Sequence, residues 1–440
     1  MTVSGWGNFP KLDARLSAPR HEAALAALVA EGRAIARGNG RSYGDSAVSV
    51  ANTIDMRCFD RMLGFDPATG QLVAEAGVML ADVIDSFLPR GWFPMVTPGT
   101  KLITLGGAIA ADVHGKNHHV DGSFRACVDW IDVMGPDGAV TRCSRDENAV
   151  LFGWTLGGMG LTGVILRCAI RLRPVKSGWI RQQMIPAENL DAVITAFEDN
   201  MDATYSVAWI DCAAKGDRLG RSLVMLGEHA DPGEVPARHR ATPFHAPRHR
   251  KITFPMNAPS FALNPLTVRA FNALYYWNGA RQKGQSIVDW DGYFYPLDAI
   301  LKWNRLYGRK GFMQFQCVLP QDTARDGLNR LLTAISESGQ ASFLSVLKRF
   351  GPQDSPFSFP MEGYTLALDF PRHARAIALM PDLDAITLDH GGRYYLAKDS
   401  RLPADTFTAA DPRAADFAAW RRDNGLADAF ASAQSERLHL

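Results

Sequence analysis

The sequence predicts an α+β protein with two domains, and three observations support this prediction. The chain has 440 residues, whereas a single hydrophobic core rarely grows beyond about 250 to 300 residues. In the N-terminal part, glycine-rich loops join strand-like segments, without a regular strand–helix–strand repeat. Further along, longer strands alternate with helices, a pattern typical of an antiparallel sheet with helices packed on it. We therefore place the first domain at residues 1–176 and the second at residues 177–392.

The composition excludes several classes of protein. The 47 basic and 46 acidic side chains give a net charge of +1, so no overall field attracts a polyanion, and nucleic acid is not expected as a partner. The six cysteines form no C-x-x-C pair, which indicates buried thiols in a reducing compartment. No segment has the uninterrupted apolar run of a signal peptide or a membrane-spanning helix. We therefore expect a cytoplasmic protein.

The first elements follow from periodicity and turn residues. Residues 21–32 (HEAALAALVAEG) predict an amphipathic helix, and residues 34–38 predict a short strand after it. Residues 63–77 predict a hairpin around a Pro-Ala-Thr-Gly turn. Residues 79–92 predict a helix that a proline and a glycine close.

The loop at residues 38–45 (GNGRSYGD) has glycines, but not in the spacing of a dinucleotide-binding loop. That loop has the pattern G-x-G-x-x-G and opens a helix. Here the glycines stand at positions 38, 40 and 44, and residues 47–56 after them are rich in β-branched side chains. We therefore expect a strand, a loop and a second strand.

Two further glycine-rich loops lie at residues 97–119 and 156–165. A loop of this kind usually serves only to turn the chain. Three such loops in one domain instead indicate one long ligand that carries an anion, because a diphosphate takes several N–H and hydroxyl donors. Suitable side chains in the same segments are those of Arg37, Arg41, Ser42 and Thr100.

The second domain shows longer elements. Residues 205–212, 311–320 and 363–371 predict strands, and residues 188–200 and 326–339 predict helices. This mixture predicts an antiparallel sheet covered by helices.

A basic insert interrupts the second domain at residues 235–251, and an apolar, aromatic stretch follows it at residues 252–277. Two interpretations remain open, a solvated loop before a core helix or a surface that meets anionic lipid. The insert has no acid, and its cations are Arg238, Arg240, Arg248, Arg250 and Lys251.

Longer motifs give the sequence a resemblance to a known family. They are ARGNGRSYGDSA at residues 36–47, PGTKLITLGGAIAADVHGKNHH at 98–119, LGGMGLTGVI at 156–165 and GGRYYLAKDSR at 391–401. Together they resemble the decaprenylphosphoryl-ribose 2-oxidase family, FAD-dependent flavoproteins of the vanillyl-alcohol-oxidase type. The resemblance runs from about residue 30 to the C-terminus and is loose over residues 176–290.

This resemblance implies a fold and a set of cofactor contacts. The fold is a PCMH-type FAD-binding domain of two α+β subdomains, a substrate domain over the flavin, and a C-terminal segment, residues 393–440, that returns to the FAD domain. The implied cofactor-binding residues are Arg37, Gly38, Asn39, Gly40, Arg41, Ser42, Tyr43, Gly44, Asp45, Gly99, Thr100, Thr104, Leu105, Gly106, Gly107, Ala111, Asp112, Val113, His114, Gly160, Ile165 and Tyr395.

The resemblance also bears on how the flavin is held. Some relatives attach the flavin covalently to a histidine of the first loop, and the corresponding residue here is Arg41. A guanidinium that stays protonated is a poor nucleophile. We therefore expect the FAD to be bound non-covalently.

Lys398 and His114 are the candidate catalytic residues. Lys398 matches an active-site lysine of the family, where it would stabilise an alkoxide-like oxygen as a cation or act as a base when neutral. The structural alternative is a surface lysine paired with Asp399. His114 would handle the proton or orient the substrate, or else be a hydrogen-bonded structural residue. The adjacent His118 and His119 lack partners at ligand spacing, so no metal site is expected.

The family implies substrate contacts as well. Ala367 stands where mycobacterial members have a pocket cysteine, and Thr365 stands where they have an asparagine, which affects substrate fit more than hydride transfer. A lysine suits a phosphate, and a carboxamide suits sugar hydroxyls. The implied substrate-binding residues are Gln316, Lys348, Thr365, Ala367 and Tyr43.

The function implied by the resemblance is oxidation of the 2-hydroxyl of a polyprenyl-phosphate-linked pentose to a 2-keto sugar, a step toward a cell-wall polysaccharide precursor. A short-chain dehydrogenase/reductase partner would complete the epimerisation, and the enzyme would work peripherally on the inner membrane. Two alternatives remain, an FAD enzyme for a soluble alditol or aldonolactone and a flavin-binding scaffold subunit of an epimerase complex.

Overall fold

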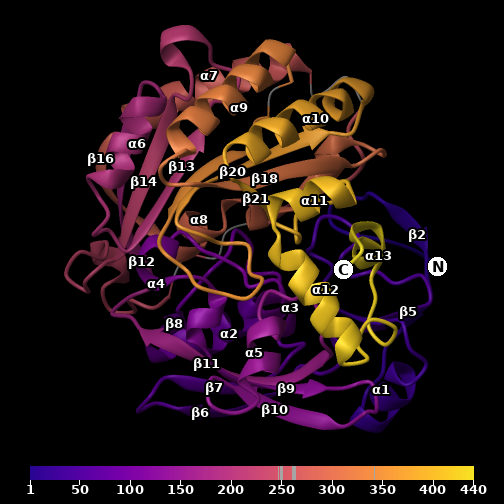
Figure 1. Ribbon diagram of the computed structural model, residues 1–440. Coiled ribbons are helices and arrows are strands. Elements are labelled where there is room, and N and C mark those ends of the chain that lie inside the picture. The colour runs from indigo at the N-terminus through magenta and orange to yellow at the C-terminus, as the bar shows by residue number, and fades with distance from the viewer. Residues whose placement is uncertain (246, 248–250, 260–263, 341) are drawn as a thin grey trace.

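The computed structural model of the chain describes residues 1–245, 247, 251–259, 264–340 and 342–440. Two antiparallel sheets dominate it, the smaller low in Figure 1 and the larger above it. Both contribute to one hydrophobic cluster, which includes Leu72 from the smaller sheet and Leu366 from the larger. An α+β fold is therefore confirmed.

The smaller sheet has the strand order β10-β9-β11-β7-β6, with β8 paired to β11. Helix α2 (Leu80–Phe87) is amphipathic and buries its apolar side in the shared core. The hairpin predicted at residues 63–77 and the helix predicted at residues 79–92 are confirmed by β6, β7 and α2. The strands are β6 (Met62–Asp66), β7 (Gln71–Glu75), β8 (Trp92–Pro94), β9 (Val128–Met134), β10 (Val140–Ser144) and β11 (Val164–Pro174).

A three-stranded parallel sheet lies beside the smaller sheet and delivers the first glycine-rich loop. Its order is β3 (Leu16–Ser17), β5 (Asn52–Asp55) and β4 (Ala34–Arg37), and α1 (Glu22–Val29) packs on it. The loop leaves the end of β4 and the chain returns in β5, so the predicted strand, loop and strand are confirmed. The second strand is shorter than the predicted 47–56, because residues 45–50 form turns and bends before it.

The larger sheet has eight strands in the order β16-β12-β14-β13-β19-β20-β18-β21. Its predicted strands are found as β13, β18 and β20, and its predicted helices as α6 and α9. Helices α6 (Leu190–Glu198), α9 (Ala324–Ser338) and α10 (Ala374–Asp389) cover the face turned away from the smaller sheet (Figure 1). The strands are β12 (Trp179–Ala187), β13 (Tyr205–Ile210), β14 (Ser222–His229), β16 (Gly284–Asp289), β18 (Phe312–Pro320), β19 (Ser345–Phe350), β20 (Gly363–Pro371) and β21 (Arg393–Tyr394).

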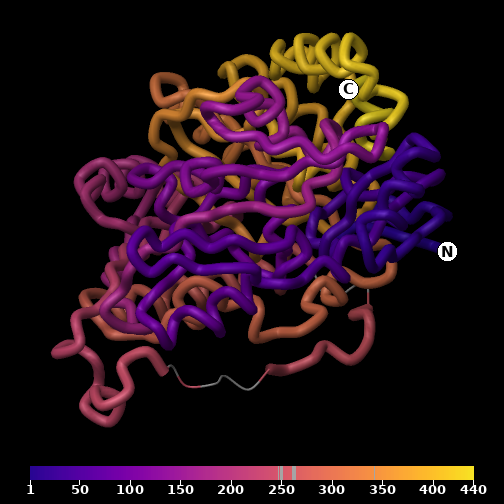
Figure 2. The backbone as a smooth tube through the Cα atoms, turned by 90° about the horizontal axis from the view of Figure 1, so that it is seen from below, coloured from indigo at the N-terminus to yellow at the C-terminus, as the bar shows by residue number. Residues whose placement is uncertain are grey.

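After β21 the chain leaves the larger sheet and packs against its own beginning. Figures 1 and 2 show this yellow segment, which holds α11 (Ala404–Ala410), α12 (Arg413–Asp423) and α13 (Ala433–Leu438), beside the indigo N-terminal strands. The Ala34 N–H donates to the Ala429 carbonyl at 2.8 Å, and the Ala431 N–H donates to the Ala34 carbonyl at 3.1 Å. The first and last parts of the sequence therefore form one structural unit.

Two shorter helices in the N-terminal part, α3 (Leu105–Ala110) and α4 (His118–Asp121), follow the second glycine-rich loop. Within the described ranges, no helix combines the length and the apolar character that crossing a bilayer requires.

Candidate functional site

A cavity of about 290 Å³ lies between the glycine-rich loops and the open face of the larger sheet. All three loops reach it, and so does the C-terminal segment. All seven residues proposed for catalysis or substrate binding line it, namely Lys398, His114, Gln316, Lys348, Thr365, Ala367 and Tyr43. It is also lined by Gly38, Asn39, Gly40, Arg41, Ser42, Gly99, Thr100, Thr104, Gly106, Gly107, Ala111, Val113, Gly160, Ile165 and Tyr395.

The first loop leaves a run of backbone amides available for a ligand. No described residue accepts a hydrogen bond from the backbone N–H groups of residues 38–42. The loop needs glycine at two points, because a Cβ on Gly38 would lie 2.2 Å from the Thr104 hydroxyl oxygen and one on Gly40, at φ 61°, would lie 2.4 Å from Arg37. Consecutive free amides of this kind form an anion-binding concavity.

Five of the implied cofactor residues do not line the cavity, namely Arg37, Gly44, Asp45, Leu105 and Asp112. These residues lie behind the cavity lining and hold it in place. The Arg37 guanidinium donates to the carbonyls of Ser4 (2.8 Å) and Ala47 (3.2 Å), which fixes both ends of the loop. Leu105 is fully buried in the shared core. Gly44 passes so close to the C-terminal segment that a Cβ would lie 2.1 Å from the Asp399 carbonyl oxygen.

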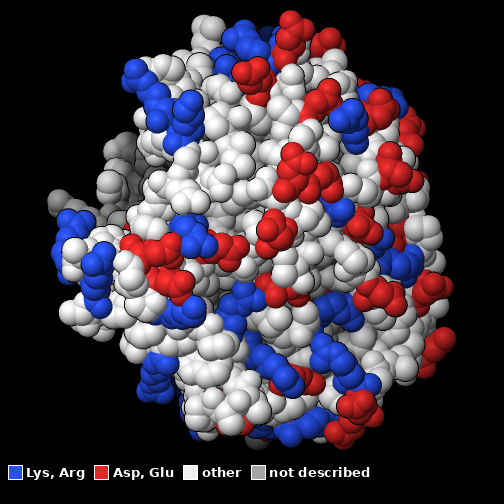
Figure 3. Space-filling model, turned by 90° about the vertical axis from the view of Figure 1, so that its left-hand side faces the viewer, with Lys and Arg blue, Asp and Glu red and all other residues white. Residues whose placement is uncertain are grey.

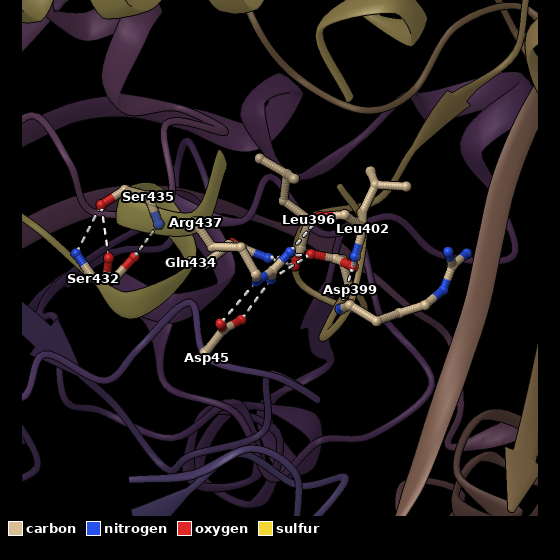
Figure 4. Close-up of polar contacts among 9 residues, drawn as sticks. Asp45, Leu396, Asp399, Leu402, Ser432, Gln434, Ser435 and Arg437 are labelled. Atoms are coloured by element: carbon tan, nitrogen blue, oxygen red, sulfur yellow. Dashed lines mark hydrogen bonds and ion pairs between the residues drawn. The ribbon is translucent and has the colours of Figure 1, made fainter. Parts of the chain in front are cut away.

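Asp45 belongs to a buried ion-pair network with the end of the chain (Figure 4). Arg437 of α13 donates to Asp45 at 2.9 Å and to Asp399 at 2.8 Å. Gln434 donates to Asp399 as well, at 3.1 Å. Although burial opposes the charge of Arg437, the two carboxylates raise its pKa. Asp399 therefore pairs with Arg437, which contradicts the alternative of a surface pair between Asp399 and Lys398.

Asp112 joins the second glycine-rich loop to the substrate side of the molecule. Its backbone has φ 39°, and its side chain is fully buried. The carboxylate accepts hydrogen bonds from the hydroxyls of Ser123 (2.8 Å) and Ser358 (2.6 Å) and from the Arg125 N–H (2.8 Å). The Gln353 amide donates to the same carboxylate at 3.2 Å, and all four donors would lose this acceptor without it, so we assign Asp112 a structural role.

Lys398 stands at the polar end of the cavity, with its Nζ 3.7 Å from the centroid of the Tyr43 ring. Burial lowers the pKa of Lys398 to about 8, against the opposing field of Asp369. Burial likewise raises the pKa of Asp369 to about 7. The two groups titrate as a pair, and an amine with this pKa exchanges a proton near neutral pH.

Sequence reasoning missed Asp369 and its neighbour Gln314, whose amide donates to one Asp369 oxygen. Both line the cavity. Side chains on a strand alternate between faces, so on β20 Asp369 shares the face of Thr365 and Ala367. The period-two pattern along the predicted strand was the signal that would have identified it.

His114 is held as a neutral imidazole. Its Nε2 lies 3.2 Å from the Gln316 amide nitrogen, which also donates to the Thr365 hydroxyl at 3.3 Å. Burial lowers the pKa of His114 well below its usual value, and the field of Lys348 lowers it further. With Gln316 donating to Nε2, the ring proton sits on Nδ1, which has no partner among the described residues.

Two further lysines belong to this region, Lys348 in the cavity lining and Lys116 behind it, near enough for the field of Lys348 to act on it. Burial lowers the pKa of Lys348 to about 8 and that of Lys116 to about 7, the latter with help from the field of Lys348. The Lys116 ammonium donates to the Tyr293 carbonyl and lies 4.0 Å from the Tyr293 ring centroid. Lys116 was not predicted, although it lies within the second motif. The field of Asp369 acts on Lys398, and among the described residues no carboxylate forms an ion pair with Lys348 or Lys116, so the site favours an anionic ligand.

Two other residues that line the cavity, Trp6 and Asp298, lie outside the motifs. The Arg41 guanidinium lies 4.0 Å from the Trp6 ring centroid, and Trp6 precedes the region of resemblance. Asp298 accepts hydrogen bonds from the Thr100 hydroxyl (2.7 Å) and the Lys101 N–H (2.9 Å). These contacts join segments about 200 residues apart, which no local pattern reveals.

The two adjacent histidines have other partners. His118 Nε2 lies 3.0 Å from Gln353, and His119 Nε2 lies 2.8 Å from the Ala203 carbonyl. The described residues contain no group of three or more His, Cys, Asp or Glu side chains placed to hold a metal ion.

Comparison with known proteins gives concordant findings. Residues 14–144 match the model of the FAD binding domain family. Over 413 residues, 92% of this chain and 89% of the relative, the sequence is 36% identical to the decaprenylphosphoryl-β-D-ribose oxidase of Mycolicibacterium smegmatis. It is 31% identical to an uncharacterized protein of Streptomyces coelicolor over 82% of this chain and all of that protein. Cytokinin dehydrogenase 5 of Arabidopsis thaliana is 30% identical over 33% of this chain and 28% of its own length.

Proposed function

Since the chain belongs to the decaprenylphosphoryl-β-D-ribose oxidase family and FAD is its cofactor, we propose that it oxidises the 2-hydroxyl of a pentose linked to a polyprenyl phosphate. The product is the 2-keto sugar. The observation that carries this proposal is the polar end of the cavity, where a proton-exchanging pair and one further lysine, Lys348, adjoin the loops of the cofactor site.

The residues present fit FAD as a ligand. The free amides of residues 38–42 suit its diphosphate, and the second and third glycine-rich loops extend the same cavity. We assign FAD to the unit proposed at residues 1–176 together with the returning segment 393–440. Tyr395 lines the cavity from that segment, with its hydroxyl donating to the Ala111 carbonyl at 3.0 Å.

When bound, FAD supplies the hydride acceptor of an alcohol oxidation. The chain must then orient the carbinol and take up the hydroxyl proton. We assign the proton to Lys398 Nζ, because a pKa of about 8 leaves a useful fraction of neutral amine near pH 8. His114 orients the substrate, because its Nε2 already accepts from Gln316 and its Nδ1 proton remains free to donate to a sugar oxygen.

We assign the substrate phosphate to Lys348, which lines the cavity, with Lys116 behind it adding a second positive charge. An anion at Lys348 would relieve the repulsion between the two lysines and the cost of burying them, and lysine binds phosphate as a point charge. Thr365 and Ala367 form the neighbouring wall on β20. Their small side chains leave room for the pentose.

The remaining parts of the proposal concern the partner enzyme and the location in the cell. A 2-keto sugar returns to the alcohol of opposite configuration only when a second enzyme delivers hydride, so we propose a short-chain dehydrogenase/reductase as the partner. Because a long prenyl chain stays in lipid, we place the enzyme at the cytoplasmic face of the inner membrane as a peripheral protein.

Anaerobic reduction of the flavin tests the substrate. A prenylphosphoryl ribose with a short prenyl chain should bleach the visible absorption of the holoprotein, whereas ribose, alditols and aldonolactones should not. Bleaching by an alditol or an aldonolactone, without bleaching by the prenylphosphoryl ribose, would show that the substrate is a soluble sugar derivative. Bleaching by none of them would favour a flavin-binding scaffold.

A further inference from the structure

One long segment of the chain has an unusual charge. Between Glu234 and Asp289 the sequence contains no acidic residue, although the whole chain has 46 of them. Eight lysines and arginines lie in this segment: Arg238, Arg240, Arg248, Arg250, Lys251, Arg269, Arg281 and Lys283. Arg248 and Arg250 lie outside the described residues. The segment is therefore strongly cationic within a nearly neutral protein.

Helix α7 (Pro265–Arg281) lies in this segment and is apolar on its outward side. Its inner stripe, Val268, Asn272 and Gly279, is buried against the larger sheet. On the opposite side, Leu266, Leu274 and Trp277 are 77%, 63% and 51% exposed. These positions follow the i, i+8, i+11 spacing of one helix face. A surface helix normally presents polar residues on its solvent-facing side. The apolar outward face of α7 is therefore suited to contact a partner.

The exposed apolar side chains concentrate around α7. Among the described residues, fourteen large apolar side chains are exposed, and seven of them lie within residues 252–277. An exposed apolar patch of this kind marks an interaction site more often than chance. Besides the three outward residues of α7, the patch contains Ile252, Met256, Phe271 and Tyr275.

The patch lies close to the cavity in the fold. Phe271 contacts Phe343, with ring centroids 5.7 Å apart, and the next residue, Leu344, lines the cavity. In Figure 1, α7 lies along the upper edge of the larger sheet, and in Figure 2 the described part of residues 235–259 runs along the lower edge of the molecule. Figure 3 shows that acidic side chains gather mainly in the centre and right of that view, whereas its upper left carries uncharged and basic surface.

We propose that the outward face of α7, with residues 251–259 beside it, docks on an anionic lipid bilayer. Apolar side chains enter the interface while the surrounding cations meet the lipid phosphates, and the two attractions add. Arg281 supports this assignment, because its guanidinium lies 3.7 Å from the Trp277 ring centroid, a pairing suited to the boundary between acyl chains and headgroups. This inference rests on the proposed function, because docking would bring the cavity to a substrate whose prenyl chain stays in the bilayer.

A second copy of the chain is a poorer occupant of this face. In a twofold-symmetric dimer the same patch meets itself, so the cations of the acid-free segment would face their own copies without a carboxylate between them. A polyanion such as nucleic acid would satisfy the cations but leave Leu266, Leu274 and Trp277 in water.

Vesicle co-sedimentation of the holoprotein tests the proposal. Vesicles of phosphatidylcholine with phosphatidylglycerol should pull down the protein, and vesicles of phosphatidylcholine alone should do so at least about tenfold less well. The double variant Leu274→Ser/Trp277→Ser should weaken binding about tenfold or more. The matched control is Ile377→Ser, because Ile377 is 45% exposed on α10, outside the patch, and it should bind as the unchanged protein does.

A charge variant keeps the test independent of the apolar substitutions. Lys251→Glu/Arg269→Glu should also weaken binding, and the loss should be largest at low salt. Retained flavin and an unchanged melting temperature would show that each variant is folded. Equal binding to both vesicle types, no binding to either, or binding that neither double variant changes would overturn the proposal. A dimer in solution that Leu274→Ser/Trp277→Ser dissociates would overturn it too, in favour of a second copy.

The result of the vesicle experiments can be judged separately from the test of the substrate proposal. Flavin reduction by a short-chain prenylphosphoryl ribose without vesicles should be the same in the Leu274→Ser/Trp277→Ser variant and the unchanged protein. If the unchanged protein fails this assay, the substrate proposal fails, while vesicle binding is judged on its own data.

Discussion

At the scale of single residues, the proposed chemistry depends on two buried ionisable groups. Lys398 and Asp369 share one end of the cavity, and burial moves the pKa of each toward neutrality, to about 8 and about 7. Proton uptake by Lys398 requires the neutral amine. The rate of flavin reduction should therefore rise as the pH rises through about 8.

Asp369→Asn provides the test at this scale. The carboxylate of Asp369 raises the pKa of Lys398, so its removal should lower that pKa and move the rise in rate to lower pH. The measurement is the pH dependence of anaerobic flavin reduction in the variant and the unchanged protein. A rate that instead falls as the pH rises through this range would mean that Lys398 acts as a cation, stabilising the substrate oxygen.

At the scale of elements, α13 secures the first glycine-rich loop. Arg437 joins Asp45, at the end of that loop, to Asp399, next to Lys398 in sequence. Both carboxylates are buried. A single side chain of α13 therefore ties the first glycine-rich loop to the residue next to the proposed catalytic lysine.

Arg437→Gln should destabilise the fold by about 3 kcal/mol, because it leaves two buried carboxylates without their cation. The free energy of urea unfolding and the fraction of bound FAD should both fall. The matched control is Arg33→Gln, which breaks the exposed ion pair between Arg33 and Glu436 of the same helix and should cost at most about 1 kcal/mol. Equal losses in the two variants would contradict a special role for Arg437.

Strands and helices with clear periodicity were predictable from the sequence, and so were the residues carried by contiguous motifs. Thr365 and Ala367 were proposed as substrate contacts and line the cavity, yet Asp369, two residues further on the same face of β20, was not, because the resemblance assigned it no role. Asp298 reaches the site through contacts with Thr100 across about 200 residues. For the segment around α7, the sequence did not decide between a core helix and a lipid-facing surface. An apolar run does not show which side of a helix other parts of the protein cover.

At the scale of the whole molecule, distant parts of the chain line the cavity proposed for FAD, and we propose that the flavin is held there without a covalent bond. Arg41 stands at the loop position where a histidine would be needed for covalent attachment of the flavin. Its guanidinium lies 4.0 Å from the centroid of the Trp6 ring. Acid precipitation of the untagged protein should therefore release all of the flavin into the supernatant. A yellow pellet after precipitation would show a covalent attachment through another residue.

The hydrogen bonds between Ala34 and residues 429–431 have a consequence for biosynthesis. Arg437 follows Asp45 by about 390 residues, so the first glycine-rich loop cannot gain these contacts until that later part of the chain has been synthesised. A truncation that removes residues 429–437 should therefore weaken flavin binding at the first loop, although that loop lies in the opposite part of the sequence.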